Sequence, residues 1–319
     1  MDSVKTKIMI VGFGVVGQGF FDLFHSKKES LGLNNVEITE IVDKKYGYIE
    51  KPPIDLTKKI NGKTDYPLID PVEAIRNSDA SIVCEFTWVN YKDAEPAFTH
   101  MKTALENGKH VITTNKGPVA LRMDELKTIS KKTGNNVLFK GTVMAGTPSF
   151  NIVKLIPGAK VLRIRGILNG TTNFILEQMS KGSDFESALK EAQSLGYAEA
   201  DPTNDVEGFD SAAKVAILSN YFGWRHKMSD VQREGIKNVS REEATHGTKL
   251  LATISKTEAS VAPLQLEDSD LLRHVNGVMN ALEIETDSLG PIYIMGPGAG
   301  RKETAQAALT DLMEILSMN

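Results

Sequence analysis

The chain has 319 residues, which at roughly 150 residues per domain indicates about two domains. Its composition is that of an ordinary globular protein, and its net charge of −4 is too small and of the wrong sign for a nucleic-acid binder. No apolar run approaches the roughly 18 residues of a membrane span, and Met1–Lys5 runs straight into a predicted strand, which leaves no room for a signal peptide. The single cysteine, Cys84, excludes a disulfide framework and a cysteine-cluster metal site. We therefore expect a cytoplasmic protein with no membrane or nucleic-acid partner.

The first 145 residues alternate strand-like and helix-like segments. Short apolar or alternating runs predict strands at Lys7–Val11, Val36–Val42, Ser81–Thr87 and His110–Thr114. Helical spacing of apolar residues predicts helices at Val15–Phe24, Ala94–Asn107 and Pro118–Thr133, and a glycine follows each of the last two segments. This alternation predicts an α/β fold with a Rossmann-type, doubly wound parallel sheet.

The segment Lys44–Pro67 interrupts this alternation. It holds six lysines, the pair Pro52-Pro53 and the pair Asn61-Gly62, so we expect an exposed excursion from the sheet. Two interpretations stay open, a lid over a bound cofactor and a mobile surface segment.

After about residue 145 the pattern changes. Helical spacing recurs at Ala145–Ile156, Asn173–Ser180, Phe185–Leu195 and Phe209–Phe222. One strand is expected at Val161–Leu168, and short strands follow from about 250 to 295. These segments predict a second, α+β domain.

A glycine-rich turn lies between the first predicted strand and the first predicted helix. Its sequence, Gly12-Phe13-Gly14-Val15-Val16-Gly17, is the pattern G-x-G-x-x-G. The first glycine permits a tight turn, the second lets the backbone approach a pyrophosphate, and the third allows the helix to pack closely on the strand. The helix N-terminus supplies N–H donors and a positive dipole to the phosphates, so we expect a dinucleotide site here.

The choice of dinucleotide stays open. Asp43 ends the second predicted strand, 26 residues after Gly17, and a carboxylate there would accept hydrogen bonds from a ribose diol, which favours NAD. Lys44 and Lys45 follow it, and with the lysines at 58 and 59 they could neutralise a 2′-phosphate, which favours NADP. A lysine-rich segment is also typical of a solvated surface.

Acidic residues are densest between Gly196 and Lys214. Within this stretch Asp210 and Lys214 are four residues apart, so they share one face of a predicted helix. The residues around them on this helix are small and apolar, which predicts that the lysine is buried and that it has a partner and a function. An EF-hand is excluded, because glycine arrives at the eighth position of the acidic run and Ala212 occupies the twelfth.

These motifs, in this order, resemble homoserine dehydrogenase over nearly the whole chain. The most specific is the run G-Y-A-E-A-D-P-T-x-D-x-x-G-x-D-x-x-x-K from Gly196 to Lys214. The other matching segments are Gly12–Gly17, Thr113–Lys116, Asn169–Asn173, Leu272–Asn280 and Gly296–Gly300.

The resemblance implies a reversible, NAD(P)-dependent interconversion of L-homoserine and L-aspartate 4-semialdehyde by hydride transfer, in threonine and methionine biosynthesis. It implies that Lys214 donates the proton in the reduction, and that Lys116 orients the substrate and stabilises the developing oxyanion. The implied substrate-binding residues are Glu199, Asp205, Asp210, Gly170 and Thr171. Among them Asp205 is expected to keep Lys214 charged and aimed.

The resemblance also extends the cofactor site and the domain plan. To the three glycines and Asp43 it adds the cofactor-binding residues Phe13, Val15, Val16, Thr87, Lys116, Gly196, Gly298 and Ala299. Residues from about 300 to 319 are expected to return as a helix to the nucleotide domain, which then comprises 1–144 plus about 300–319. The middle, 145–299, is expected to bind the substrate and to form the sheet of a homodimer.

Two departures from the family are informative. Family members usually bind a monovalent cation through a glutamate and nearby backbone carbonyls, and here Lys140 stands in the glutamate's place. A positive charge disfavours a bound cation, so we expect no metal, with the Lys140 ammonium in the ion's position and bonded to carbonyls near Val143 and Ala145. Many relatives also carry a C-terminal regulatory domain, which we expect this chain to lack, together with feedback inhibition by threonine.

The residues argue against three other interpretations. An aldehyde-oxidising semialdehyde dehydrogenase needs an exposed cysteine to form a thioester, whereas Cys84 lies inside an apolar predicted strand. A non-catalytic sensor of the dinucleotide's redox state would need the glycine turn but not the group Glu199, Asp210 and Lys214. The six histidines show no spacing typical of a zinc site.

Overall fold

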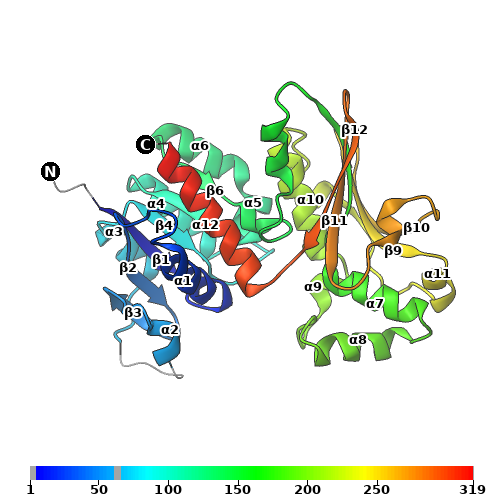
Figure 1. The fold of residues 1–319 in the computed structure, drawn as a ribbon, viewed down its shortest axis with the longest axis horizontal. Helices are drawn as coiled ribbons and strands as arrows, with labels where there is room; N and C mark the ends of the chain where they lie inside the picture. The colour runs from blue at the N-terminus through cyan, green and yellow to red at the C-terminus, as the bar shows by residue number, and fades with distance from the viewer. Residues whose placement is uncertain (1–4, 61–65, 319) are drawn as a thin grey trace. The chain divides into compact units, whose positions relative to one another are not determined.

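A computed structural model describes residues 5–60 and 66–318. The chain divides into two compact units (Figure 1), unit 1 with Met1–Gly146 and Gly300–Asn319, and unit 2 with Thr147–Ala299. The N-terminal start, where no signal peptide is expected, and Asn61, Gly62 and Lys63 of the lysine-rich segment lie outside the described residues. In the described part of the chain, no helix combines the length and the apolar character that crossing a membrane requires.

Unit 1 is built on a six-stranded sheet with the order β3-β2-β1-β4-β5-β6. Its strands are β1 Thr6–Val11, β2 Val36–Asp43, β3 Gly47–Glu50, β4 Ile82–Glu85, β5 His110–Thr113 and β6 Val137–Leu138. All neighbours are parallel except the edge strand β3, which pairs antiparallel with β2. The predicted Rossmann-type sheet is therefore confirmed, with one antiparallel edge.

Helices cover both faces of this sheet (Figure 1). One face packs against α1 (Val15–Lys27) and α12 (Arg301–Ser317), the other against α3 (Pro71–Asn77), α4 (Ala97–Glu106) and α6 (Met123–Thr133). Successive strand residues point to opposite faces, so Ile8 and Ile10 join the first core while Met9 and Val11 join the second. The helix α12 belongs to unit 1 because its apolar stripe, which includes Leu312, is fully buried there.

Two predicted features of unit 1 are wrong in detail. The single helix expected at Pro118–Thr133 is two helices, α5 (Lys116–Leu121) and α6, with Arg122 between them outside helical geometry. The Lys44–Pro67 segment is not wholly an exposed excursion, since it contains β3 and the short helix α2 (Leu56–Lys59). Ile49 and Leu56 are buried in the core, so this part of the segment is anchored by apolar contacts that its lysines obscure.

Unit 2 is a six-stranded sheet with the order β12-β11-β7-β9-β10-β8. Its strands are β7 Val161–Ile167, β8 Gln232–Arg233, β9 Thr248–Ser255, β10 Ala259–Gln265, β11 Met279–Thr286 and β12 Gly290–Pro297. Its helices are α7 Gly170–Ser180, α8 Phe185–Ser194, α9 Thr203–Val206, α10 Phe209–Tyr221 and α11 Arg241–Thr245. The predicted α+β character is thus present, with all strands antiparallel to their neighbours except β8 beside β10.

The helix expected at Ala145–Ile156 does not form as an α-helix. Only a 3₁₀ helix is present, at Phe150–Leu155. Ala145 has a φ of 47°, and Pro148 disfavours helical geometry at the residue before it. The apolar spacing of this segment therefore predicted a longer helix than the backbone allows.

Candidate active site

The glycine turn joins β1 to α1 in unit 1, and each of its three glycines has a distinct environment. Gly12 has a φ of +92°, and a Cβ there would lie 2.7 Å from the carbonyl carbon of Phe86. A Cβ on Gly17 would overlap the carbonyl oxygen of Gly12, so the start of α1 can approach the turn only without a side chain. A Cβ on Gly14 would meet open space, which leaves this backbone accessible to a ligand.

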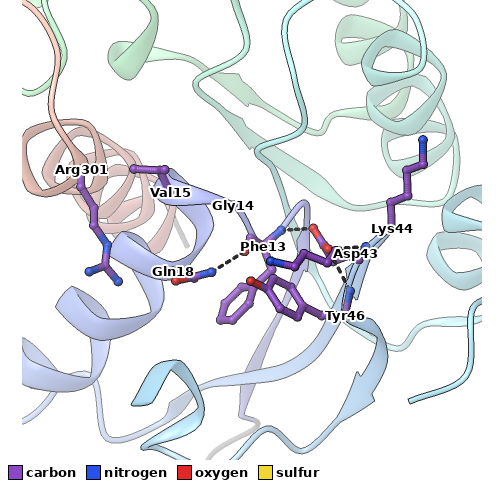
Figure 2. A pocket seen from close by; sticks show the side chains of 9 residues that line it. Phe13, Gly14, Val15, Gln18, Asp43, Lys44, Tyr46 and Arg301 are labelled. Carbon is purple, nitrogen blue, oxygen red and sulfur yellow. Dashed lines mark hydrogen bonds between the residues drawn. The ribbon is translucent and has the colours of Figure 1, made fainter. Parts of the chain in front are cut away.

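Asp43, the last residue of β2, holds the turn from the side (Figure 2). Its Oδ2 accepts a hydrogen bond of 2.7 Å from the Phe13 backbone N–H, and its Oδ1 accepts from the backbone N–H groups of Lys45 and Tyr46, at 2.7 and 3.1 Å. The Phe13 ring is fully buried, edge-on to the rings of Phe21 and Tyr46. Phe13 can therefore meet a cofactor only through its backbone.

A cavity of about 820 Å³ opens beside this turn. Figure 2 shows Arg301 entering it from α12 on one side, with Asp43, Lys44 and Tyr46 on the other. Val15 is exposed at its rim, whereas Val16 packs against the core behind it. The cavity thus combines the N-terminus of α1 with three cationic side chains, Lys44, Lys45 and Arg301, which suits an anionic ligand.

A second cavity of about 800 Å³ lies at the carboxyl ends of β1, β2 and β4. Its walls are mostly apolar and include Val42, Ile69, Phe86 and Trp88, and Thr87 also lines it. Ligands of open α/β sheets bind at this edge, and apolar walls of this kind fit a flat ring. Lys116 stands at the same edge as the first residue of α5, following Asn115, which caps the helix.

A cluster of polar side chains in unit 2 is centred on Lys214 and includes Asp210, Asn169 and Asp205. Lys214 lies on α10 and is only 6% exposed. Its Nζ is 2.7 Å from Oδ2 of Asp210, one helical turn earlier, and it donates a hydrogen bond of 2.5 Å to the carbonyl oxygen of Leu168. The ion pair expected from the i and i+4 spacing is present and buried. The second partner, the carbonyl of Leu168 directly after β7, could not be predicted from the local sequence pattern.

Asn169 connects this lysine to the acidic loop. Its Nδ2 donates to Oδ1 of Asp205 at 2.6 Å and to Oδ2 of Asp210 at 3.1 Å, while its Oδ1 accepts from the N–H of Thr172 as the cap of α7. Asp205 therefore reaches Lys214 through Asn169 and Asp210. Sequence reasoning missed this role of Asn169, although an asparagine directly before Gly-Thr-Thr is a recognisable helix-capping signal.

The remaining predicted residues of unit 2 lie on loops and at helix starts. Thr171 donates from Oγ1 to the Tyr197 carbonyl at 2.6 Å, which ties the start of α7 to the loop after α8. Gly196 has a φ of +75° on that loop, and Glu199 is exposed a few residues later. Three glycine or alanine positions complete the set: Gly170 packs against Val278, Gly298 lies against the Asn280 side chain, and Ala299 is exposed.

The hypothesis for Lys140 is wrong in its partners. Its ammonium donates to Oδ1 of Asp311 at 2.6 Å and to Oε2 of Glu314 at 2.5 Å, both on α12, and its backbone N–H donates to Oδ2 of Asp311. It does not bond to carbonyls near Val143 and Ala145, because two carboxylates bind an ammonium more strongly than neutral carbonyls do. Burial alone would lower the pKa of Lys140, but Asp311 and Glu314 outweigh it and raise that pKa.

Two further features bear on the chemistry. Within residues 5–60 and 66–318, no three His, Cys, Asp or Glu side chains gather in a way that could hold a metal ion. Cys84 is fully buried in β4, and burial raises the pKa of its thiol, so it is unsuited to forming a thioester.

Two family models together match most of the chain. A family described as homoserine dehydrogenase matches residues 148–313, and its NAD-binding domain matches residues 12–140. The chain belongs to the homoserine dehydrogenase family. The family and the NAD(P)-dependent oxidoreductase class predicted from the sequence are thereby confirmed.

Individual relatives of this family cover nearly the whole chain. The homoserine dehydrogenase of Sulfurisphaera tokodaii is 43% identical over 96% of this chain and 97% of its own length. The NAD(+)-dependent homoserine dehydrogenase of Pseudomonas canavaninivorans is 36% identical over 97% and 96%. Among solved structures, a hyperthermophilic archaeal homoserine dehydrogenase mutant in complex with NADPH has a TM-score of 0.87 at 32% identity, covering 99% of this chain and 98% of its own.

Proposed function

We propose that Lys214 is the acid/base of homoserine oxidation and aldehyde reduction in this protein. The observation that carries this role is the anchoring of its ammonium by Asp210 and the Leu168 carbonyl. Within the described residues these contacts use two of its three N–H donors, which leaves one for a substrate oxygen. In the direction of aldehyde reduction Lys214 gives its proton to the developing alkoxide, and in the reverse direction it takes the proton back.

The substrate is proposed to bind on the same unit. Homoserine carries an ammonium group, for which Glu199 and Asp210 supply negative charge, while Asp205 supports Lys214 through Asn169 and Asp210. Gly170 and Thr171 stand at the N-terminus of α7, where backbone N–H groups favour a carboxylate. These assignments make 145–299 the substrate-binding domain.

Residues 1–144 and 300–319 are proposed to bind the dinucleotide, whose nicotinamide supplies or accepts the hydride when bound. The turn Gly12–Gly17 fits a pyrophosphate, because Gly14 presents open backbone at the N-terminus of α1. Thr87 and Lys116 contribute from the carboxyl ends of β4 and β5. By the resemblance Gly196, Gly298 and Ala299 of unit 2 also contact the cofactor.

For cofactor choice we propose a preference for NADP over NAD. Both oxygens of Asp43 are already used by three backbone N–H groups, which weakens its role as a reader of the ribose diol. Lys44 and Lys45 line the same cavity and supply positive charge for a 2′-phosphate, whereas Arg301 on its other side already pairs with Asp22 at 2.7 Å. The relatives include both an enzyme named as NAD(+)-dependent and a structure with NADPH.

We also propose that the protein works in the cytoplasm, as a homodimer formed through the sheet of unit 2. The edge strand β12 supports this assembly, because it exposes Tyr293 and Met295 on one face, at 42% and 61% exposure. An exposed apolar edge strand is usually covered by a partner.

One assay tests the proposal as a whole. Purified protein is mixed with L-homoserine and either NADP or NAD, and the absorbance of the reduced nicotinamide is followed. We expect turnover with both and a higher kcat/KM with NADP. Lys214→Ala should lower kcat by about 10²- to 10⁴-fold while the Kd for NADPH changes less than about twofold. Turnover that survives this substitution would show that another group moves the proton.

A further inference from the structure

A fully buried carboxylate lies directly below the candidate cofactor site. Glu85 is the last residue of β4, in the centre of the sheet, and its exposed fraction is 0%. In the sheet register it stands between Val11 of β1 and Thr113 of β5, at the edge where the predicted cofactor residues emerge. A carboxylate in this position is costly to bury, so its partners must account for it.

The first partner of Glu85 is Thr87, one of the predicted cofactor residues. Oε1 of Glu85 accepts a hydrogen bond from the Thr87 backbone N–H at 3.2 Å and a short one from the Thr87 hydroxyl. Both donors of Thr87 are therefore directed inward to the same carboxylate oxygen. This pair of bonds sets the conformation of the chain as it leaves β4.

A second set of bonds leads from Glu85 to the loop that carries Lys116. The Thr113 hydroxyl is 3.0 Å from the Glu85 carbonyl and 3.4 Å from its Oε2, and it accepts from the Asn115 backbone N–H at 3.0 Å. The Asn115 amide then donates back to the carbonyls of Thr87 and Trp88, at 3.1 and 3.0 Å. Its Oδ1 accepts from Gly117 N–H at 3.1 Å, so the network closes around the residue that precedes Lys116.

The ionic surroundings of Glu85 are sparse. Within the described residues the one basic side chain within 4 Å of its carboxylate is His100 of α4, whose Nδ1 is 3.5 Å from Oε1. That Nδ1 is itself buried and has no hydrogen-bond partner in the described part of the chain. An apolar side chain would fill this position at lower cost, so the hydrogen bonds to the two loops are what the carboxylate provides.

We propose that Glu85 is a positioning residue for the nicotinamide dinucleotide, which it serves by holding the Thr87 loop and the Asn115–Lys116 loop in their binding conformation. The proposal rests on the cofactor roles proposed above for Thr87 and Lys116. Because Glu85 is fully buried, it acts through these neighbours.

The test compares steady-state KM values for NADPH and for the aldehyde substrate in Glu85→Met, Glu85→Gln and Thr87→Val. Glu85→Met should raise KM for NADPH about tenfold and KM for the aldehyde by a smaller factor, because only the segment with Lys116 is expected to meet the substrate as well. Glu85→Gln, which keeps an acceptor for Thr87, should restore most of the affinity. Partial unfolding alone would lower the apparent kcat and leave both KM values in place.

Glu40→Met is the matched control. Glu40 is a second buried carboxylate of the same sheet, on β2, and accepts hydrogen bonds from Ser78 and Tyr48 away from the predicted cofactor residues. Glu40→Met should leave KM for NADPH unchanged. An equal rise in that KM in the Glu40 variant would overturn the proposal.

The outcomes distinguish a failure of the positioning role of Glu85 from a failure of the cofactor role of Thr87. If Thr87→Val raises KM for NADPH and Glu85→Met leaves it within about twofold of the parent, only the positioning role of Glu85 is wrong. If Thr87→Val has no effect, the cofactor role of Thr87 is wrong and the Glu85 proposal fails with it. Should Glu85→Met not fold, Thr113→Val cuts the network on the Asn115 side, where an unchanged KM would overturn the proposal and a rise of about threefold or more would support it.

Discussion

At the scale of single residues, three lysines with little exposure differ in the partners that surround their ammonium groups. Lys214 pairs with a carboxylate on its own helix, and Lys140 pairs with two carboxylates of α12. Lys249, on β9, is as buried as Lys214, and its acceptors among the described residues are neutral, Oδ1 of Asn173 at 3.0 Å and the Val275 carbonyl at 2.6 Å. Burial therefore lowers the pKa of Lys249 to about 8, with Glu177 opposing the shift and Arg273 adding to it.

This lowered pKa predicts how stability depends on pH. Below about pH 8 Lys249 is protonated in both the folded and the unfolded protein, so the full cost of burying its charge is present. Between about 8 and its ordinary value of 10.5 the unfolded chain binds a proton that the folded protein has released, so stability rises with pH. Lys249→Met removes this dependence. From about pH 7 to about pH 9.5, urea denaturation should show the parent gaining about 1–2 kcal/mol relative to the variant.

A constant difference between parent and variant over this range would contradict the lowered pKa. Lys5→Met is a matched control, since Lys5 is exposed and pairs with Glu37 at the surface. Its difference from the parent should stay constant across the same pH range.

At the scale of elements, the β1–turn–α1 unit is where sequence and geometry agree most closely. The glycine spacing, the strand before it and the helix after it are all local features, and each is present in the structure. The elements that differ from the sequence-based prediction are those whose local pattern is overridden by other constraints. The strand β3 forms because it pairs with β2. The Ala145–Ile156 segment does not form an α-helix, because Ala145 has a positive φ.

The second and third glycines of this turn, Gly14 and Gly17, predict opposite outcomes for the same substitution. Gly17→Ala should lower the free energy of unfolding by about 1–3 kcal/mol, because its methyl group would overlap the Gly12 carbonyl. Gly14→Ala should leave stability nearly unchanged, because its methyl group points into open space, yet weaken cofactor binding about tenfold or more by blocking the backbone. Chemical denaturation and NADPH fluorescence titration measure the two effects. Tight NADPH binding by Gly14→Ala would contradict the proposed phosphate site.

At the scale of the whole molecule, the polar clusters are divided between two compact units. The glycine turn, Asp43, Thr87 and Lys116 belong to unit 1, and the Lys214 cluster belongs to unit 2. Unit 1 includes the last helix of the chain, whose buried stripe completes one face of its core.

The proposed homodimer predicts the effect of a charge on the edge strand of unit 2. Met295→Glu places a carboxylate on the exposed face of β12, where desolvating it in an interface is unfavourable. Light scattering coupled to size-exclusion chromatography should give the mass of a dimer for the parent and a shift toward the monomer for the variant. Leu289→Glu is the comparison, because Leu289 lies at the turn between β11 and β12 and its side chain, like that of Met295, is exposed. A monomeric parent protein would refute the assembly.

The sequence alone determined the features that depend on spacing along the chain. These are the strand–helix alternation of unit 1, the glycine turn that follows β1, and the pairing of Asp210 with Lys214 across one helical turn. Only the tertiary structure decided which distant groups complete them: the Leu168 carbonyl on Lys214, the Asn169 bridge to Asp205, and the binding of Lys140 to Asp311, 171 residues away. The physical reason is that hydrogen-bond and ion-pair energies depend on distance in space, and a contact between remote segments leaves no periodic trace in the sequence.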